Sequence, residues 1–147
     1  MSESVVGKDF EDLRLKALLE YQVLGSLPES EFDSITRLAS YLSKKSIATI
    51  SFLDGEYQFI KSQIGFSSER SSVEDSICQF AIKGSEILEI NNTLEDDRTL
   101  GLKCVTGGAK IRFYAGVPII NPEGYVLGSL CVMDVVPGRL DEQQKEA

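Results

Sequence analysis

The sequence predicts an α+β domain with a central antiparallel sheet, helices on one face, and a lid of loops and short helices over a pocket on the other. Residues 111–134 read as two long, almost wholly apolar strands joined by the turn Asn121-Pro122-Glu123-Gly124. In this turn Pro122 presets its own φ and Gly124 accepts a positive φ. Residues 47–64 form a second hairpin around Asp54-Gly55. Two amphipathic helices come before the first strand of the chain, and this order favours an α+β architecture.

Two helices are expected before the first strand. Residues 10–24 carry apolar side chains at helical spacing, and Gly25 follows as a helix-ending glycine. Residues 29–44 form the second helix, with glutamates in its first turn and lysines at its end, as the helix dipole favours. The apolar stripe of this second helix comprises Phe32, Ile35, Leu38, Ala39 and Leu42.

Short elements fill the middle of the chain. They are strands over 47–53 and 57–64, a helix over 76–83 and a strand over 87–90. The polar segment 65–72 is expected to be a loop, and Asp75 or Ser76 is expected to cap the following helix.

Residues 91–108 have no regular pattern and contain one or two possible helical turns. Loops longer than about 12–15 residues in a compact domain are usually functional, so we expect this segment to cover the open face of the sheet as a lid. Residues 1–9 read as a loose lead-in, and residues 140–147 begin a helix. We therefore expect a single domain over 1–147 that is a fragment of a longer protein.

The composition and net charge argue against several classes of function. The 147 residues carry a net charge of -8 without a cluster of lysine and arginine, which argues against nucleic-acid binding. No apolar run approaches the about 20 residues of a membrane span, and the polar N-terminus is unlike a signal peptide. Three cysteines form no zinc pattern, so a reducing, cytoplasmic setting is expected. The chain has no histidine, which excludes a Ser-His or Cys-His nucleophile pair.

Several motifs stand in the order of one known family. The most specific are IRFYAGVP at 111–118 and GSLCVMD at 128–134. Weaker matches are RLKALLEYQVL at 14–24, Ser76-Ile77-Cys78 and Asp97-Arg98. Together they extend over nearly the whole chain, which resembles a GAF domain. The most similar subgroup is the N-terminal sensory one of bacterial sensor histidine kinases and diguanylate cyclases.

The resemblance implies a sensory domain, without catalytic activity of its own, that binds a small molecule. It also implies relay through terminal helices to an output domain, such as the histidine kinase of a two-component system or a nucleotide cyclase. Such helices often pair, which implies a homodimer. Family ligands include cyclic nucleotides, bilins and haem, but the absence of histidine excludes a His-ligated haem and the Cys-His pair of many bilin-binding relatives. The residue pattern of cyclic-nucleotide-binding relatives is missing as well, so the ligand and any cofactor stay unknown.

Candidate ligand-binding residues lie on the predicted strands and around the lid. Arg112 and Tyr114 share one face of their strand, where a positive charge beside a phenol suits an anionic ligand. The alternative is that Arg112 pairs with Asp97 or Asp134 to hold the lid in place. The full set of candidates is Phe59, Lys61, Cys78, Asp97, Arg112 and Tyr114.

Two other functions stay open. Some GAF proteins are free methionine-R-sulfoxide reductases, and Cys78 stands at a helix start, where the dipole lowers the pKa of a thiol. With Cys104 in the lid, it would form the catalytic pair of a reductase or of a thiol redox sensor. Cys131 has the plain interpretation of a small buried core residue, and Cys78 shares it. The remaining possibility is a ligand-free domain that serves only dimerisation or protein interaction.

Overall fold

The computed structural model describes residues 13–14, 30–54, 56–65 and 70–146. The expected helix over 10–24 falls outside these residues except for Leu13 and Arg14, which are helical. The expected lead-in over 1–9 and the helix-ending Gly25 lie outside them as well.

One antiparallel sheet forms the centre of the domain. Its six strands run in the spatial order β3-β2-β1-β6-β5-β4, and every neighbouring pair is antiparallel. The strands are β1 Ile47–Leu53, β2 Tyr57–Ile64, β3 Arg70–Ser72, β4 Leu88–Ile90, β5 Phe113–Ile120 and β6 Val126–Asp134. The predicted hairpins are therefore both present, and they meet where β1 pairs with β6.

The turn of the central hairpin has the predicted chemistry. Gly124 adopts a positive φ of 91°, and its N–H donates to the Asn121 carbonyl oxygen at 2.9 Å. The Asn121 side chain accepts a further hydrogen bond from the Tyr125 N–H at 2.8 Å. Because this turn fixes the register of β5 and β6, their side chains alternate reliably between the two faces of the sheet.

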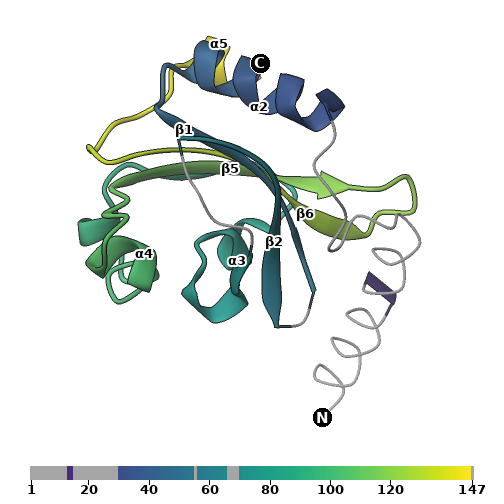
Figure 1. Cartoon of the computed structure of the whole chain (residues 1–147), viewed down its shortest axis with the longest axis horizontal. Helices are drawn as coiled ribbons and strands as arrows, with labels where there is room; N and C mark the ends of the chain where they lie inside the picture. Colours follow the sequence, from purple (N-terminus) through teal and green to yellow (C-terminus); the bar gives the residue numbers. More distant parts are fainter. Residues whose placement is uncertain (1–12, 15–29, 55, 66–69, 147) are drawn as a thin grey trace.

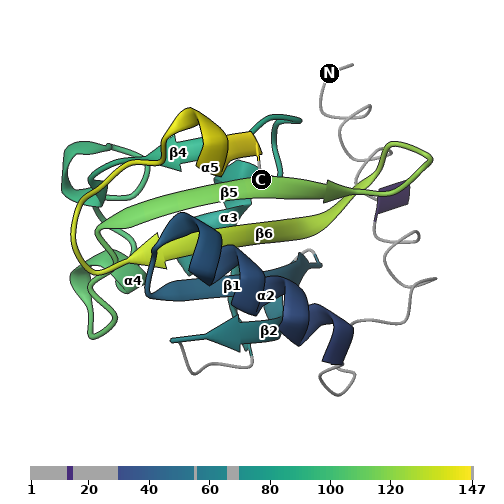
Figure 2. The same ribbon diagram turned by 90° about the horizontal axis from the view of Figure 1, so that it is seen from above.

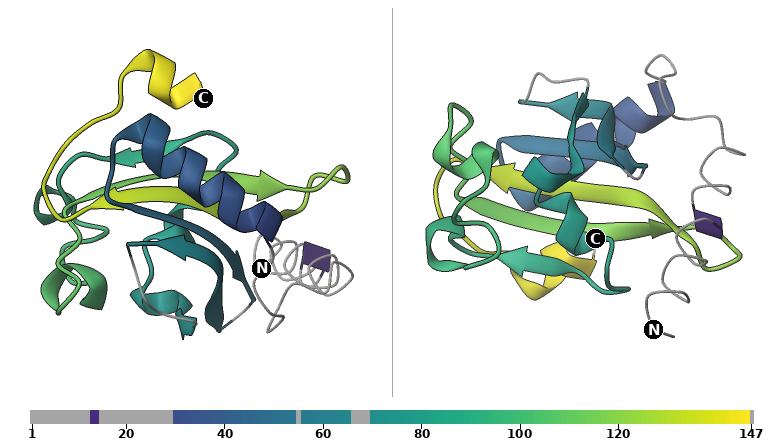
Figure 3. Two further views of the ribbon diagram at one scale, coloured as in Figure 1. Left: turned by 45° about the horizontal axis from the view of Figure 1, so that its top comes forward. Right: turned by 90° about the horizontal axis from the view of Figure 1, so that it is seen from below.

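Helices cover the two faces unequally. Helix α2, Ser30–Ser43, and helix α5, Glu142–Glu146, lie on one face, which we call the helix face (Figures 1 and 2). The short helices α3, Cys78–Ala81, and α4, Lys103–Thr106, lie on the other, which we call the lid face (Figures 1 and 3). The predicted α+β architecture is confirmed in these layers.

Strand β1 shows how the two faces are filled. Ala48, Ile50 and Phe52 pack with residues of the helix face, including Ala39 and Phe32 of α2. Ile47 and Leu53 pack instead with residues of α3 and α4, namely Cys78, Ala81 and Val105. Apolar residues occur on both faces of this strand because both faces are covered.

Two elements differ from the prediction. Residues 70–72, expected within a loop, form the edge strand β3, in which Ser72 pairs with Tyr57 of β2. A three-residue polar strand has no periodic signal in the sequence. Helix α3 is shorter than the predicted 76–83, although the Ser76 hydroxyl does accept the Gln79 N–H at 3.3 Å as a cap would.

The segment 91–108 contains the 3-10 helix η2, Thr93–Glu95, followed by α4. Its polar side chains attach it to the start of β5. The Thr93 hydroxyl donates to the Ile111 carbonyl oxygen at 2.7 Å, and the Thr99 hydroxyl donates to the Thr93 carbonyl oxygen at 2.8 Å. Both threonines are fully buried, so this segment is an ordered cover at one end of the lid face.

Candidate functional site

Four small side chains form a polar patch at the middle of the sheet. Thr49 and Ser51 of β1 pair across the strands with Cys131 and Ser129 of β6. All four are buried, and the alternation along β1 puts them on the lid face with Leu53. A hydroxyl-rich centre is unusual between two apolar layers, and we refer to these four residues with Gln58 as the polar patch.

Buried polar atoms of the polar patch lack ordinary hydrogen bonds. Thr49 Oγ1 has no partner other than the Cys131 sulfur, and Ser51 Oγ and Gln58 Oε1 have no partner. The three residues are 1%, 0% and 7% exposed, respectively, so bulk solvent does not reach them. Gln58 pairs with Leu53, two positions along β1 from Ser51, so its side chain lies on the same face of the sheet as the Ser51 hydroxyl. Buried polar groups are hydrogen-bonded in more than about 90% of cases, so the two exceptions at Ser51 and Gln58 make this part of the sheet a candidate site.

A thiol cluster adjoins the polar patch. Cys78 Sγ of α3 lies 3.1 Å from Cys131 Sγ of β6. The Tyr114 hydroxyl donates to Cys78 Sγ at 3.3 Å and lies 3.2 Å from Cys131 Sγ. The Ser129 hydroxyl lies 3.2 Å from Cys131 Sγ, so three polar side chains surround this one sulfur atom.

These contacts give the thiols of Cys131 and Cys78 different pKa values. Burial alone raises the pKa of Cys131, but interactions with Cys78, Ser129, Tyr114 and Thr49 lower it to about 7. The hydrogen bond with Cys131, together with burial and the charge on Cys131, holds the pKa of Cys78 well above its usual range. The sequence placed the acidic thiol at Cys78 through a helix dipole, and that expectation is wrong, because α3 is only four residues long and the donors surround Cys131 instead.

Gly128 lets the polar patch form. A Cβ on Gly128 would collide with the backbone of β1 at the Ser51 carbonyl and would lie 2.8 Å from Phe52 Cα. Only glycine permits this close approach of β6 to β1, and the approach brings Ser129 opposite Ser51.

Arg112 holds the lid through carbonyl groups. Its Nη1 donates to the Val105 carbonyl oxygen of α4 at 2.8 Å and to the Ile111 carbonyl oxygen at 3.1 Å. The expected ion pair with Asp97 or Asp134 is wrong: Asp97 is exposed, and Asp134 accepts from Ser46 and Val135. The sequence identified the role of Arg112 in holding the lid but assigned it the wrong acceptor.

The six candidate binding residues do not form one cluster. Cys78, Arg112 and Tyr114 lie on the lid face, whereas Phe59 pairs with Phe52 on the helix face. Lys61 lies where the register of the pairing between β1 and β2 shifts, and its Nζ is 5.7 Å from the centre of the Phe32 ring of α2. That irregularity follows Ile50, and a bulge of this kind was not readable from the sequence. Whether any of these residues binds a ligand stays a prediction.

The expected pair of Cys78 and Cys104 is not formed, because the sulfur in contact with Cys78 belongs to Cys131. Burial raises the pKa of Cys104 to about 11.

Four residues of the polar patch were not predicted from the sequence, namely Thr49, Ser51, Gln58 and Ser129. A signal for the first two was present, since a polar residue at every second position of an otherwise apolar strand marks one face.

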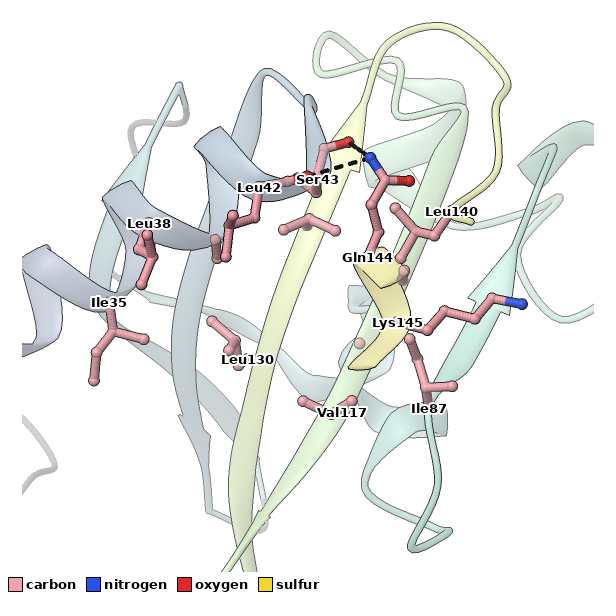
Figure 4. A pocket seen from close by; sticks show the side chains of 14 residues that line it. Ile35, Leu38, Leu42, Ser43, Ile87, Val117, Leu130, Leu140, Gln144 and Lys145 are labelled. Carbon is pink, nitrogen blue, oxygen red and sulfur yellow. Dashed lines mark hydrogen bonds between the residues drawn. The ribbon is translucent and has the colours of Figure 1, made fainter. Parts of the chain in front are cut away.

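The helix face carries an open apolar groove of about 360 Å³ between α2 and α5 (Figure 4). Leu38 is 57% exposed, and Ile35 and Leu42 are also exposed, so the apolar stripe of α2 is only partly covered. Gln144 of α5 closes one end by donating to the Leu42 and Ser43 carbonyl oxygens at 3.2 and 3.1 Å.

Two classes of site are not found within the described residues. No three or more acidic or cysteine side chains gather there in a way that could hold a metal ion. Among the same residues, no helix is long and apolar enough to cross a membrane.

Comparison with known proteins gives a family match. The model of the GAF domain family matches residues 28–147. A cyclic di-GMP phosphodiesterase of Pseudomonas aeruginosa is 38% identical over 117 residues, which are 78% of this chain and 20% of that protein. The chain thus corresponds to about one fifth of the length of this relative.

Solved structures share the fold at low sequence identity. The GAF domain of an Acinetobacter phosphoenolpyruvate-protein phosphotransferase is 14% identical, with a TM-score of 0.64 over 92% of this chain and 84% of that chain. A type II free methionine-R-sulfoxide reductase of Thermoplasma acidophilum is 11% identical, also with a TM-score of 0.64, over 80% of this chain and 81% of that chain.

Proposed function

Because the chain belongs to the GAF domain family, whose members are generally sensory or regulatory, we propose that it binds a small molecule at the polar patch of the lid face. Binding there would be passed through the terminal helices to an output domain of a longer signalling protein. The domain itself would be non-catalytic and cytoplasmic.

The observation that carries this proposal is the pair of buried atoms without a partner, Ser51 Oγ and Gln58 Oε1. Leaving one such atom unpaired costs about 1–3 kcal/mol, so a molecule that pairs with them gains that free energy on binding. The residues that surround a binding site usually include a few such polar groups among apolar ones.

The side chains also favour a ligand class. The polar patch contributes uncharged hydroxyl and amide groups together with the Cys131 thiol, whose pKa is lowered to about 7 and whose thiolate form would repel an anion. Arg112, the nearest candidate cation in the sequence analysis, is engaged with backbone carbonyl groups. We therefore propose a neutral, hydrogen-bonding ligand in place of the anionic ligand that the sequence suggested.

The output domain is proposed from the relative. Residues similar to this chain occupy one fifth of a cyclic di-GMP phosphodiesterase, which supports an output domain that turns over a cyclic dinucleotide. The sequence resemblance also includes histidine kinases and nucleotide cyclases as outputs. A homodimer through the terminal helices fits the exposed apolar stripe of α2, since such surfaces commonly mark interaction sites.

The reductase alternative has weaker support. It rests on a fold shared with a methionine sulfoxide reductase, but its required pair of Cys78 and Cys104 is not formed. Turnover of free methionine sulfoxide with a thiol donor, at a rate above that of a Cys78→Ser variant, would restore it.

Native mass spectrometry of the purified chain, next to its denatured mass, tests the proposal. We expect a reproducible non-covalent mass excess that identifies the ligand, and we expect Ser51→Ala and Thr49→Val to lose it. The matched control Ser85→Ala changes an exposed serine and should keep the excess. A chain without any excess after incubation with a cell metabolite extract, together with a large dimer fraction, would favour the ligand-free interaction module.

A further inference from the structure

Two buried thiols from distant parts of the chain are in contact on the lid face. Cys78 begins the short helix α3 and Cys131 lies in the central strand β6, and their sulfur atoms are 3.1 Å apart. Cys78 is 3% exposed and Cys131 is 0% exposed. The sensory function proposed above includes Cys131 in the polar patch but assigns no role to its contact with Cys78.

We propose that Cys78 and Cys131 form an oxidation site, at which a hydroperoxide converts the two thiols into a disulfide that ties α3 to β6. The inference is independent of the ligand at the polar patch. It differs from the expected pairing of Cys78 with Cys104 in both the residues and the elements that are joined.

The contact geometry suits this bond. A disulfide has an S–S length of about 2.05 Å, so the sulfur atoms need to approach by about 1 Å. Helix α3 contains one turn. The Gln79 N–H donates to the Ser76 hydroxyl at 3.3 Å near its start, and the Ile82 N–H donates to the Cys78 carbonyl oxygen at 3.1 Å at its end. A short helix of this kind can shift by that distance more easily than a strand paired on both sides, so we expect α3 to move.

The chemistry assigns a different role to each sulfur. Cys131 is the nucleophile, because the Ser129 hydroxyl and the Cys78 thiol lie within hydrogen-bonding distance of its sulfur and can donate to a thiolate there, while the Tyr114 hydroxyl donates to Cys78 Sγ. The Cys131 sulfur attacks one peroxide oxygen, the O–O bond breaks, and the second oxygen takes up a proton and leaves as water. Cys131 is then a sulfenic acid.

Cys78 completes the reaction. Its sulfur attacks the Cys131 sulfur, the S–S bond forms, the S–O bond breaks, and the hydroxyl leaves as water with the Cys78 proton. The two thiols lose two electrons and two hydrogens in total, and one hydrogen peroxide becomes two waters. An alkyl hydroperoxide would give one alcohol and one water.

Burial limits which oxidants react. A larger disulfide oxidant cannot reach two sulfur atoms that are almost fully covered, whereas hydrogen peroxide is close to the size of the gaps that open when α3 fluctuates. Oxidation would also change the polar patch, because Cys131 is the cross-strand neighbour of Thr49 and a hydrogen-bond partner of Ser129. The redox state of the pair would thereby alter the candidate ligand site.

The test counts and maps thiols in the whole chain. Reduced protein is treated with a small excess of hydrogen peroxide, unfolded in iodoacetamide, and analysed by intact mass and by peptide mapping without reductant. We expect alkylation to fall from three cysteines to Cys104 alone, with a peptide pair linked through Cys78 and Cys131. A disulfide to Cys104, or three alkylated cysteines after an exposure that fully oxidises reduced dithiothreitol, would overturn the proposal.

Variants at each cysteine distinguish the role of the Cys78–Cys131 pair from that of Cys104. Cys104→Ser should lose two thiols as the wild type does, whereas Cys78→Ser and Cys131→Ser should form no intramolecular disulfide. If either variant fails to fold, the wild-type peptide map still decides the question. The measurement needs no ligand, so its failure would leave the proposed ligand site unaffected, and the absence of a ligand would leave this pair unaffected.

Discussion

The ring of Tyr114 lies over Gly116, two residues along the same strand. A Cβ on Gly116 would collide with the Tyr114 hydroxyl and would lie 2.8 Å from the ring carbon that bears it. Glycine at position 116 therefore provides the space in which the phenol reaches both Cys78 and Cys131. Two residues of the motif IRFYAGVP thus act together, since Tyr114 supplies the hydroxyl and Gly116 leaves the space that it occupies.

Gly116→Ala is expected to destabilise the domain by about 1–3 kcal/mol, because the added methyl group overpacks a buried position and displaces the Tyr114 ring. Gly84→Ala is the matched control, since a Cβ at Gly84 meets nothing within 4 Å and should change stability by less than about 0.5 kcal/mol. Urea unfolding followed by circular dichroism measures both. Equal midpoints for the two variants would show that Tyr114 does not depend on Gly116.

The ionisation of Cys131 should make stability depend on pH. Its pKa of about 7 in the folded protein is below the about 8.5 of an ordinary thiol, so between these values the folded state holds fewer protons. The contribution of Cys131 to stability should then rise from pH 7 to about 8.5, by at most about 1.4 kcal/mol per pH unit, and be lost as the pH falls through 7. Cys78 and Cys104, whose pKa values are raised, oppose this rise from about pH 8, where they ionise in the unfolded state alone, and the raised pKa of Tyr114 opposes it at higher pH.

The chain suits this measurement because it has no histidine, whose titration would otherwise overlap. Urea unfolding under a phosphine reductant at several pH values, compared with Cys131→Ala, isolates the effect. The difference in unfolding free energy between the wild type and the variant should rise over this range. A difference that stays level between pH 7 and 8.5 would mean that Cys131 stays protonated.

Arg112→Ala should loosen the lid. The change removes two hydrogen bonds from a charged donor to the Val105 and Ile111 carbonyl oxygens, at an expected cost of about 1.5–3 kcal/mol. Arg98→Ala is the control, because Arg98 pairs with Asp96 at 2.7 Å on the surface, where such pairs contribute less than about 1 kcal/mol. Amide hydrogen exchange should rise in residues 102–110 for the first variant alone. Unchanged exchange in both would mean that Arg112 does not hold α4.

The sequence predicts the fold well because its signals are local. The apolar alternation of β1 and β6 and the turn chemistry of Asn121 and Gly124 each act over a few residues, and the structure has the expected hairpins. The three-residue β3 was missed because its pairing with β2 is set by neighbours in space. The bulge after Ile50 was missed for the same reason, and it leaves Phe59 and Lys61 away from the lid face.

The candidate site was harder to predict because it depends on cross-strand register. Thr49 and Ser51 are inconspicuous until β6 brings Cys131 and Ser129 opposite them. Cys78 was identified from its position at a helix start, but Cys104 was chosen as its partner and Cys131 was interpreted as a core residue, because the placement of α3 against β6 depends on tertiary packing.

The most direct test of the ligand site compares two buried strand serines in the ligand-free chain, refolded from denaturant. The Ser51 hydroxyl has no partner, whereas the Ser62 hydroxyl lies 2.8 Å from Thr36 Oγ1 and donates to Asp33 Oδ1 at 2.6 Å. We measure the free energy of unfolding in urea. Ser62→Ala should lose about 1.5–3 kcal/mol, and Ser51→Ala should be as stable as the wild type or more stable, as expected for a hydroxyl reserved for a ligand. A loss in Ser51→Ala equal to that in Ser62→Ala would contradict the account, because the Ser51 hydroxyl would then already be part of the structure.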